Sequence, residues 1–527
     1  MIPFFLSFFV FHPLIGSAVI LALPTSQKHL YKGINLFFCA MQVVVSIAMY
    51  WFFQPNSSGY QFVEKADWIT FSLGNLGTVS IDYLLGVDGI SFPLVVLTSV
   101  VMLVGAVASW NIDKREKAYF SLYLLLTTSV TGCFVALDFF LFFLFFEFML
   151  LPMYFLIGLW GGPRREYASI KFFLYTLVGS ILILIVMIGL YLSVIDPVES
   201  ELTRTVVHTF DLRYMTDMGN YLPDTFLSLS GEPSIGGIPA RMLAFWLLFI
   251  GFAIKLPIVP LHTWLPDAHV EAPTPVSVVL AGILLKVGGY GLLRIAYPIF
   301  PDAANEYAFT LALLGVISII YGGFNALAQN DLKKMIAYSS VSHMGFVVLG
   351  IASLTAEGVN GAVYQMVSHG ILSAMLFLIA GVLYDRTHNR LIDSYRGLIG
   401  PMPAFTVVTG VAFFASLGMP GFSGFVGELF TLMGGFQSNV LPGWVAAAGT
   451  LGIILAAAYF LWTLQRMFFG KLWVKNAAEL PLLSDLNVRE KWLLIPLSVI
   501  TLLLGLFPNL LFQLSDKTVA DLLKIFE

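Results

Sequence analysis

Apolar runs follow one another along almost the whole chain. Each is close to or above the ~20 residues that a helix needs to cross the hydrocarbon core of a bilayer. Of the 527 residues, 58% are hydrophobic and 11% are charged, whereas soluble domains carry roughly 25% charged residues. There are too few charges to cover a globular surface of this size. The sequence therefore predicts an all-α polytopic membrane protein.

About fourteen transmembrane helices are predicted. The seventh carries Pro257 and Pro260 directly after Lys255, and proline removes a backbone donor and clashes with the preceding turn. The twelfth is too long for one straight helix and contains GMPGFSGFVGE, so both helices are expected to be discontinuous. The predicted spans cover residues 2–23, 33–53, 87–110, 118–137, 139–160, 167–193, 241–265, 272–296, 307–329, 333–353, 357–385, 403–437, 442–470 and 490–514.

The distribution of basic residues predicts the orientation of these spans. With the N-terminus outside, most of the 27 lysines and arginines fall in inner loops, as the positive-inside rule requires. Lys333 counts with the inner loops and Arg294 with the outer ones. The longer outer segments, 54–86 and 194–240, are mixed and acidic and read as solvated loops, and 471–489 reads as an inner loop. Both termini are therefore expected on the outer side.

The two broken spans lie five spans apart, which indicates an internal repeat. A five-helix unit is odd, so its second copy must enter the membrane upside down, as in many ion-path architectures. We expect two inverted repeats, helices four to eight and helices nine to thirteen. The predicted organisation is N-terminal helices in 1–117, a first half-channel in 118–296, a second in 307–470, and a C-terminal loop, helix and tail in 471–527.

Two lysines, Lys255 and Lys286, stand near the middle of apolar segments. A charge at the bilayer centre costs roughly 2.5–3.5 kcal/mol on insertion scales, so each needs a partner, a hydrated cavity or neutralisation. The alternative is that both side chains snorkel to the surface. Each lies about 14 residues, or roughly 20 Å, from the start of its segment, which is too far for a lysine stem. These lysines indicate an ion-transporting protein.

Glu147 is the only acid in the apolar interior of the fifth span, whereas Asp138 at its outer edge reads as a helix cap. A Glu147–Lys255 pair would act as a switch, because both groups are charged together and tend to neutralise when apart. The alternative is a static ion pair that fixes helix packing. Lys286 has no acid on its own span, and a buried unpaired lysine can accept and release a proton.

His343 and His369 stand near the middle of the tenth and eleventh spans, each preceded by a serine. Histidine passes protons near neutral pH, and two at similar depth beside a lysine favour a relay over ordinary hydrogen-bonded core residues. His12 has no charged company and reads as structural. His262 and His269 have no third ligand in view, so no metal site is expected.

Glu428 follows the break in the twelfth span and is the second-half counterpart of Lys255. An acid there could deliver a proton outward. The candidate site is therefore a polar line through an apolar bundle, which is typical of proton-moving proteins. Its members are Glu147, Lys255, Lys286, His343, His369 and Glu428.

The chain shows no Rossmann fingerprint, P-loop or cysteine cluster. Cys39 and Cys133 read as small buried hydrophobes. We therefore expect no nucleotide, flavin, iron–sulfur centre or haem in this chain, and no nucleic-acid partner.

Four stretches carry a family resemblance. The chain resembles the antiporter-like membrane subunits of respiratory complex I, the NADH:quinone oxidoreductase, whose superfamily includes subunits of multisubunit cation/proton antiporters and of membrane-bound hydrogenases. Among the complex I subunits it looks like the M-type, because Glu428 stands where the L- and N-types carry lysine. The stretches are FEFMLLPMYFLIGLWGG, KLPIVPLHTWLPDAHVEAPTPVSVVLAGILLKVGGYGLLR, AQNDLKKMIAYSSVSHMG and MPGFSGFVGE.

The resemblance implies a role for each residue of the polar line. Glu147 and Lys255 match the family's coupling pair, Lys286 its central lysine and Glu428 its terminal residue, and His343 and His369 match the linking positions. It implies a subunit that pumps protons outward across a bacterial inner membrane. NADH, FMN, iron–sulfur clusters and quinone would be bound by other subunits, and L-type and N-type subunits would be its neighbours.

Three alternatives remain open. The nearest is a cation/proton antiporter or membrane-bound hydrogenase subunit of the same superfamily. The second is a structural spacer that moves nothing, and the third is a single-chain solute carrier with a polar substrate cavity.

Overall fold

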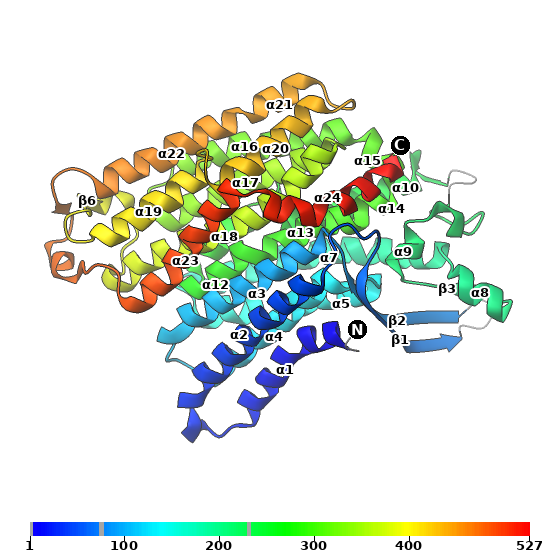
Figure 1. Cartoon of the computed structure of the whole chain (residues 1–527), viewed down its shortest axis with the longest axis horizontal. Coiled ribbons are helices and arrows are strands. Elements are labelled where there is room, and N and C mark those ends of the chain that lie inside the picture. The colour runs from blue at the N-terminus through cyan, green and yellow to red at the C-terminus, as the bar shows by residue number, and fades with distance from the viewer. Residues whose placement is uncertain (1–3, 73–77, 229–232, 527) are drawn as a thin grey trace.

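The computed structural model describes residues 4–72, 78–228 and 233–526, and almost every predicted apolar run in it is helical. Eleven helices of these ranges are long and apolar enough to cross a membrane, or twelve if a bent C-terminal pair counts as one. This confirms a polytopic helical membrane protein. Residues 2 and 3 of the first predicted span lie outside the described residues. Figure 1 shows the helices running side by side as one elongated bundle.

The first part of the chain forms helices α1 to α9. Most match a predicted span within a few residues, and the fifth span is divided at Met149 into two helices. The bounds are α1 Phe5–Ala22, α2 His29–Phe52, α3 Ser91–Ala108, α4 Glu116–Val135, α5 Phe139–Phe148, α6 Leu150–Trp160, α7 Arg165–Ser193, α8 Pro197–Thr203 and α9 Leu212–Met215.

The middle of the chain holds the first break and a long central helix. That central helix runs from Thr274 to Ile299 and contains two π-helical segments, η5 Leu280–Leu284 and η6 Leu292–Ala296. The bounds are α10 Ala240–Lys255, α11 Trp264–Glu271, α12 Thr274–Val279, α13 Leu285–Gly291, α14 Tyr297–Ile299, α15 Pro301–Glu306 and α16 Ala308–Leu327.

The last part of the chain holds the second break and a bent C-terminal pair. The bounds are α17 Leu332–Ala352, α18 Ala356–Thr387, α19 Pro403–Ser416, α20 Ser423–Gln437, α21 Gly443–Gly449, α22 Leu451–Phe468, α23 Val488–Leu506 and α24 Asn509–Leu523. In Figure 1 the α23–α24 pair crosses the bundle and ends near α15. A single straight span over 490–514 was expected. Instead the chain bends by 62° before Asn509, because Pro508 cannot continue the hydrogen-bond ladder of α23.

The expected break in the seventh span is present. Helix α10 ends at Lys255, and no helix resumes until Trp264. The indole of Trp264 donates to the carbonyl of Ile254 at 2.8 Å, so a helix-end carbonyl that lacks an intrahelical partner is satisfied inside the bundle. The N–H of Val259 donates to Ser318 Oγ at 3.0 Å. These bonds compensate for the lost helical ones, which a break in a membrane requires.

The expected break in the twelfth span lies between Ser416 and Ser423. Gly418 and Gly421 adopt φ values of +79° and +96° there, a left-handed conformation that glycine takes without steric cost. A Cβ on Gly418 would lie 2.7 Å from Glu428 Oε2. The glycine at 418 therefore both turns the chain and leaves room for a carboxylate.

The outer segments are not only loops, which corrects the expectation for 54–86 and 194–240. Strand β1 (Gln61–Ser72) pairs antiparallel with β2 (Thr78–Val87), and β2 pairs parallel with β3 (Val207–His208). The hairpin packs at one end of the bundle (Figure 1), because β2 buries Leu84, Leu85 and Val87. Residues 73–77 and 229–232 of these segments lie outside the described ranges. Two-residue pairs form elsewhere, β4 Ser234–Ile235 with β5 Ile238–Pro239 and β6 Tyr395–Arg396 with β7 Trp473–Val474.

Burial singles out two helices as the centre of the bundle. The most apolar 18-residue stretches of Thr274–Ile299 and of α18 are completely buried, whereas less than half of those of α2, α7 and Gly443–Phe468 is buried. The central pair touches closely, since a Cβ on Gly370 would lie 2.8 Å from the carbonyl oxygen of Gly282. Side chains on these two helices are therefore shielded from lipid on all sides.

Candidate functional site

Lys286 lies on the central helix with no exposed surface. Its ammonium donates to the carbonyl of Ala281 at 2.6 Å and lies 2.8 Å from Nδ1 of His369 on α18. A lysine and a histidine in direct hydrogen-bond contact can exchange a proton without water. The structure thus joins two predicted site residues that stand 83 positions apart in the chain.

The line continues from His369 to α17 and α20. The rings of His369 and His343 have centroids 5.5 Å apart, and Nδ1 of His343 lies 3.0 Å from Oε1 of Glu428. A small cavity of about 10 Å³ lies between these three side chains, about the room that one water molecule needs. Lys286, His369, His343 and Glu428 therefore form one buried chain of ionisable groups across four helices, which we call the central line.

The central line ends at Glu428, where one carboxylate oxygen has no hydrogen-bond partner in the described part of the chain. Oε2 of Glu428 has no hydrogen-bond partner among the described residues, and it rests against Gly418 at the second break. Buried carboxylate oxygens without a partner are rare and call for an explanation. An oxygen that receives a proton from water or passes one on is such an explanation.

Two π-helical segments flank Lys286 on its own helix. A π-helical turn bonds five residues back rather than four, and such turns are frequent at functional sites. The ammonium of Lys286 bonds the carbonyl of Ala281, five residues earlier and inside the first π segment. The irregular turn therefore gives the lysine a local acceptor in the middle of the bundle.

Glu147 and Lys255 are neighbours without an ion pair in the described structure. The ammonium of Lys255 lies 3.3 Å from the ring centroid of Phe146 and donates to the carbonyl of Phe146 at 3.2 Å. Glu147 is only half-buried, and its Oε1 has no hydrogen-bond partner. The ring of Phe146 thus occupies the place beside Lys255 that the carboxylate of Glu147 was expected to take. The lysine is stabilised by a cation–π contact instead.

The assignment of Arg294 to the outer surface is wrong. Its helix continues to Ile299, and Arg294 is buried in an ion pair with Asp88, which caps α3. Tyr60 and Tyr290 also contact the guanidinium. A charge-assisted network of this kind satisfies a buried arginine. Tyr60 comes from a segment that was predicted as a loop, and Asp88 stands at the edge of the third predicted span.

Lys333 was also assigned to a solvated loop, on the inner side, and it is buried as well. It stands in the first turn of α17, and its ammonium donates to the carbonyl of Ala272 at 2.7 Å. Its position at a helix end gave no sign of burial. The α11–α12 region, which packs against α17, covers it.

His12 and Asp138 agree with the sequence prediction. Both ring nitrogens of His12 bond backbone carbonyls, those of Phe8 and Phe38, as a structural histidine would. Asp138 caps α5 by accepting from the N–H of Leu141. Among the described residues, no group of three or more His, Cys, Asp or Glu side chains is placed to hold a metal ion.

A buried line of ionisable groups that runs from the central helix to a broken helix defines a class: membrane proteins that move ions through a helix bundle. The family model described as NADH:quinone oxidoreductase/Mrp antiporter, TM matches residues 136–455, which contain the whole central line. The chain belongs to this family.

Individual relatives agree with the family match. NADH-quinone oxidoreductase subunit M of Rhodobacter capsulatus is 42% identical over 525 residues, 98% of this chain and 96% of that protein. A chain of respiratory complex I from Thermus thermophilus has a TM-score of 0.80 at 28% identity and covers 99% of this chain and 100% of its own. A chain of the Mrp complex from Dietzia also has a TM-score of 0.80, covering 99% of both chains, but at 22% identity it shares the fold alone.

Proposed function

We propose that this chain is the proton-translocating M subunit of an NADH:quinone oxidoreductase. The observation that carries the proposal is the central line, in which Lys286 contacts His369 at 2.8 Å and His343 contacts Glu428 at 3.0 Å. The names of the relatives, subunit M and chain 4, supply the parent complex. NADH oxidation and quinone reduction would take place in other subunits and drive protons outward through this one.

The central line suggests an order of proton transfer. A protonated Lys286 gives its proton to Nδ1 of His369, which passes one across the small cavity to His343. His343 then protonates Glu428 at Oε1, and Glu428 releases a proton from Oε2 toward the second break. Each group has returned to its first protonation state once Lys286 has taken up a new proton, so one proton crosses per cycle.

Glu147 and Lys255 would control this transfer. Lys255 rests on the ring of Phe146, and a modest movement of its stem would bring it to Glu147. A charge shift in a neighbouring subunit would close or split that pair. Lys255 ends the broken helix α10. The break packs closely on the central helix, because a Cβ on Gly288 would lie 2.7 Å from the N–H nitrogen of Leu256. A shift of the break would therefore displace the central helix two residues from Lys286.

The membrane arrangement that fits this function has fourteen crossings. They are the twelve that length and composition single out, together with α10–α11 and α19–α20 as two broken spans. Helices four to eight (118–296) and nine to thirteen (307–470) would form two inverted half-channels. N-terminal helices in 1–117 would precede them, and 471–527 would follow. In Figure 1 both ends of the chain lie toward the hairpin side of the bundle, which would be the periplasmic side of a bacterial inner membrane.

The remaining parts of the function would belong to partners. L-type and N-type subunits would be the neighbours in the bilayer, and NADH, FMN, iron–sulfur clusters and quinone would be held elsewhere in the complex. Co-purification followed by mass identification separates this function from the cation/proton antiporter. Cluster-binding redox subunits should accompany the chain in the first case, and only small membrane subunits in the second.

The test of the function is Lys286→Ala in the assembled complex, inserted in membrane vesicles. We expect assembly to persist and NADH-driven proton uptake to be lost, because Lys286 is the one group of the described residues that bonds Nδ1 of His369. Lys475→Ala, at an exposed loop lysine, is the control and should pump normally. Normal pumping by Lys286→Ala would leave the chain a structural spacer.

A further inference from the structure

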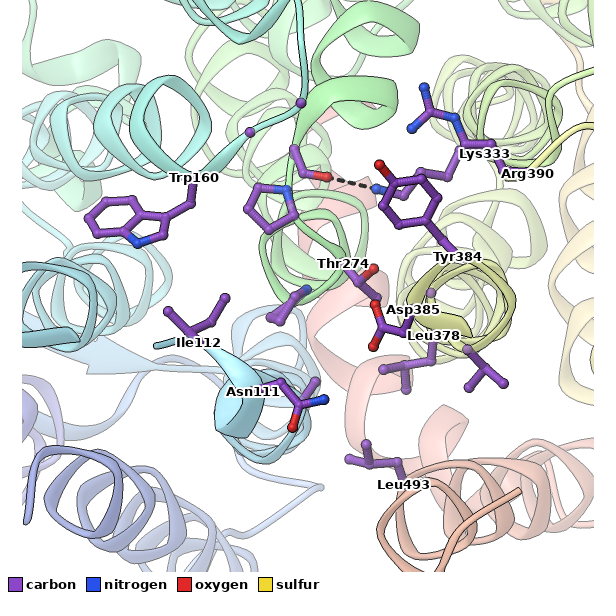
Figure 2. Close-up of a pocket in the computed structure, with 18 of the residues that line it drawn as sticks. Asn111, Ile112, Trp160, Thr274, Lys333, Leu378, Tyr384, Asp385, Arg390 and Leu493 are labelled. Atoms are coloured by element: carbon purple, nitrogen blue, oxygen red, sulfur yellow. Dashed lines mark hydrogen bonds between the residues drawn. The ribbon is translucent and has the colours of Figure 1, made fainter. Parts of the chain in front are cut away.

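A pocket of about 280 Å³ opens at the end of the bundle opposite the β1–β2 hairpin. Helix α3 begins directly after that hairpin and ends at Ala108, on the wall of this pocket. Figure 2 shows Lys333 and Asp385 reaching into the space from the sides of α17 and α18, with Thr274 beside Asp385. The pocket therefore brings solvent to the start of the central helix, which carries Lys286.

Lys333 forms the inner limit of this pocket. It is 4% exposed, and its ammonium donates to the carbonyl of Ala272 at 2.7 Å, the dashed bond in Figure 2. The ammonium also lies 3.4 Å from Oγ of Ser277. One side of the ammonium thus faces the pocket and the other faces the protein interior. A buried lysine in contact with water and with a hydroxyl can take up a proton and pass it on.

His269 lies beyond Lys333, deeper in the bundle. It has no exposed surface, and neither ring nitrogen has a hydrogen-bond partner among the described residues. Its ring stacks on Phe377 of α18 at a centroid distance of 4.3 Å. The ring is within electrostatic range of Lys333, at the pocket, and of Lys286, in the central line. A buried imidazole with two unused nitrogens near two lysines is placed as a carrier.

Ser277 lies between the backbone of His269 and the helical turn that Lys286 contacts. The ammonium of Lys286 points back along its helix to the carbonyl of Ala281, which is one helical turn from Ser277, or about 6 Å. Ser277 Oγ in turn donates to the backbone carbonyl of His269 at 3.2 Å. The serine, the histidine and the pocket therefore follow one seam, where the central helix packs against α18.

We propose that Lys286 is reprotonated from this pocket through Lys333 and His269. Lys333 takes a proton from pocket water and gives one to a ring nitrogen of His269, and His269 gives one to Lys286 after Lys286 has protonated His369. Each transfer moves one proton, and each donor regains its proton from the group nearer the pocket. The inference rests on the proposed function, and it assigns a relay role to two residues outside the central line.

The first experiment replaces the imidazole and then returns it. His269→Gly in the assembled complex should lower NADH-driven proton uptake by about tenfold or more, since positioned proton-transfer groups contribute on the order of 100-fold or more. Free imidazole added to inside-out vesicles should restore at least part of that uptake, which a purely structural histidine would not allow. His262→Gly is the matched control: it is a second buried histidine on the adjoining turn, packed between Tyr321 and Tyr338.

The second experiment blocks the pocket without touching either relay residue. Both native cysteines are buried, so Thr274→Cys introduces a reactive thiol at the pocket wall. The unlabelled variant should pump normally. A charged, membrane-impermeant thiol reagent should stop proton uptake in inside-out vesicles and have no effect in right-side-out ones. Lys475→Cys, at an exposed position of the same face, should be labelled without effect.

The outcomes separate this route from the proposed function. If Lys286→Ala abolishes pumping while His269→Gly and labelled Thr274→Cys pump at the wild-type rate, the function stands and the route is wrong. If Lys286→Ala also pumps normally, the proposed function fails first. Loss of pumping in His269→Gly that imidazole does not restore, together with full pumping by labelled Thr274→Cys, also overturns the route.

Discussion

The two broken helices hold their charged residues in opposite ways. Lys255 stands at the last position before the first break, and its ammonium meets an aromatic ring and a backbone carbonyl. Glu428 stands after the second break, and its carboxylate meets the imidazole of His343. The first break thus begins after a lysine that has no ion pair among the described residues. The carboxylate after the second break is hydrogen-bonded to His343 of the central line.

The difference indicates where transfer is controlled. Both contacts of the Lys255 ammonium, the cation–π contact and the 3.2 Å hydrogen bond, are made with one residue, Phe146, which stands next to Glu147. A movement away from that one residue is therefore enough to release Lys255. The second half of the molecule provides a connected path, and the first half provides the element that can move.

The largest effect is expected at the connected break. Glu428→Gln retains the shape of the side chain but removes its capacity to release a proton, so outward translocation should be lost. Proton uptake per NADH oxidised in vesicles measures this. Glu306→Gln, at an exposed acid, is the control. Wild-type uptake in Glu428→Gln would mean that protons leave by another route.

A smaller effect is expected at the movable break. Glu147→Gln cannot form the charged pair with Lys255, and the rate of proton translocation should fall by roughly tenfold, the scale of a weakened proton-transfer step. Assembly should be unchanged, because Oε1 of Glu147 holds no hydrogen bond. Glu166→Gln, at an exposed acid of α7, should behave like the unmodified complex. Equal rates for both variants would remove Glu147 from the account.

Packing at the first break should show in stability. A Cβ at position 288 would lie 2.7 Å from the backbone nitrogen of Leu256 and the backbone oxygen of Phe252, so Gly288→Ala should destabilise the protein by about 1–3 kcal/mol. The thermal denaturation midpoint of the purified complex measures the loss. Gly410→Ala, where nothing lies within 4 Å, should keep the midpoint or raise it. A tolerated Gly288→Ala would show that the break can shift freely against the central helix.

The smallest effect is expected from the ring that holds Lys255. Phe146→Leu removes the cation–π contact and should shift Lys255 toward Glu147 by roughly 2- to 30-fold in population, the equivalent of 0.5–2 kcal/mol. The change should appear as an altered translocation rate that vanishes when Glu147→Gln is also present. Phe155→Leu, at an exposed ring of α6, should leave the rate unchanged. Additive effects of Phe146→Leu and Glu147→Gln would contradict the exchange between ring and carboxylate.

Much of the site could be predicted, because the position of a residue within an apolar run indicates how deep it lies in the membrane. An ionisable residue in the middle of an apolar run is expected inside the bundle. Five of the six candidate residues are buried there, whereas Glu147 is only half-buried. The prolines after Lys255 and the glycines before Glu428 marked both breaks. The depth of a residue in the membrane does not, however, predict which side chain it contacts. Whether Lys255 meets Glu147 or the ring of Phe146 depends on side-chain rotamers and on how α5 turns against α10.

The burial of Arg294 and Lys333 was not predicted, and the reason is the same for both. Arg294 and Lys333 lie near helix ends, where lysine and arginine usually reach solvent. They are buried because segments distant in sequence cover them, Tyr60 and Asp88 over Arg294 and the α11–α12 region over Lys333. The hairpin was missed because its strands lie in long, mixed segments between spans. No pattern within a single helix contains that information.

The central claim is that protons pass from Lys286 to Glu428 through the paired imidazoles. His369→Gln tests it most directly, because His369 contacts both Lys286 and His343. The measurement is proton uptake per NADH oxidised by the assembled complex in inside-out vesicles. The account predicts that uptake through this subunit is lost while the complex remains assembled. An unchanged ratio of protons to NADH would contradict it.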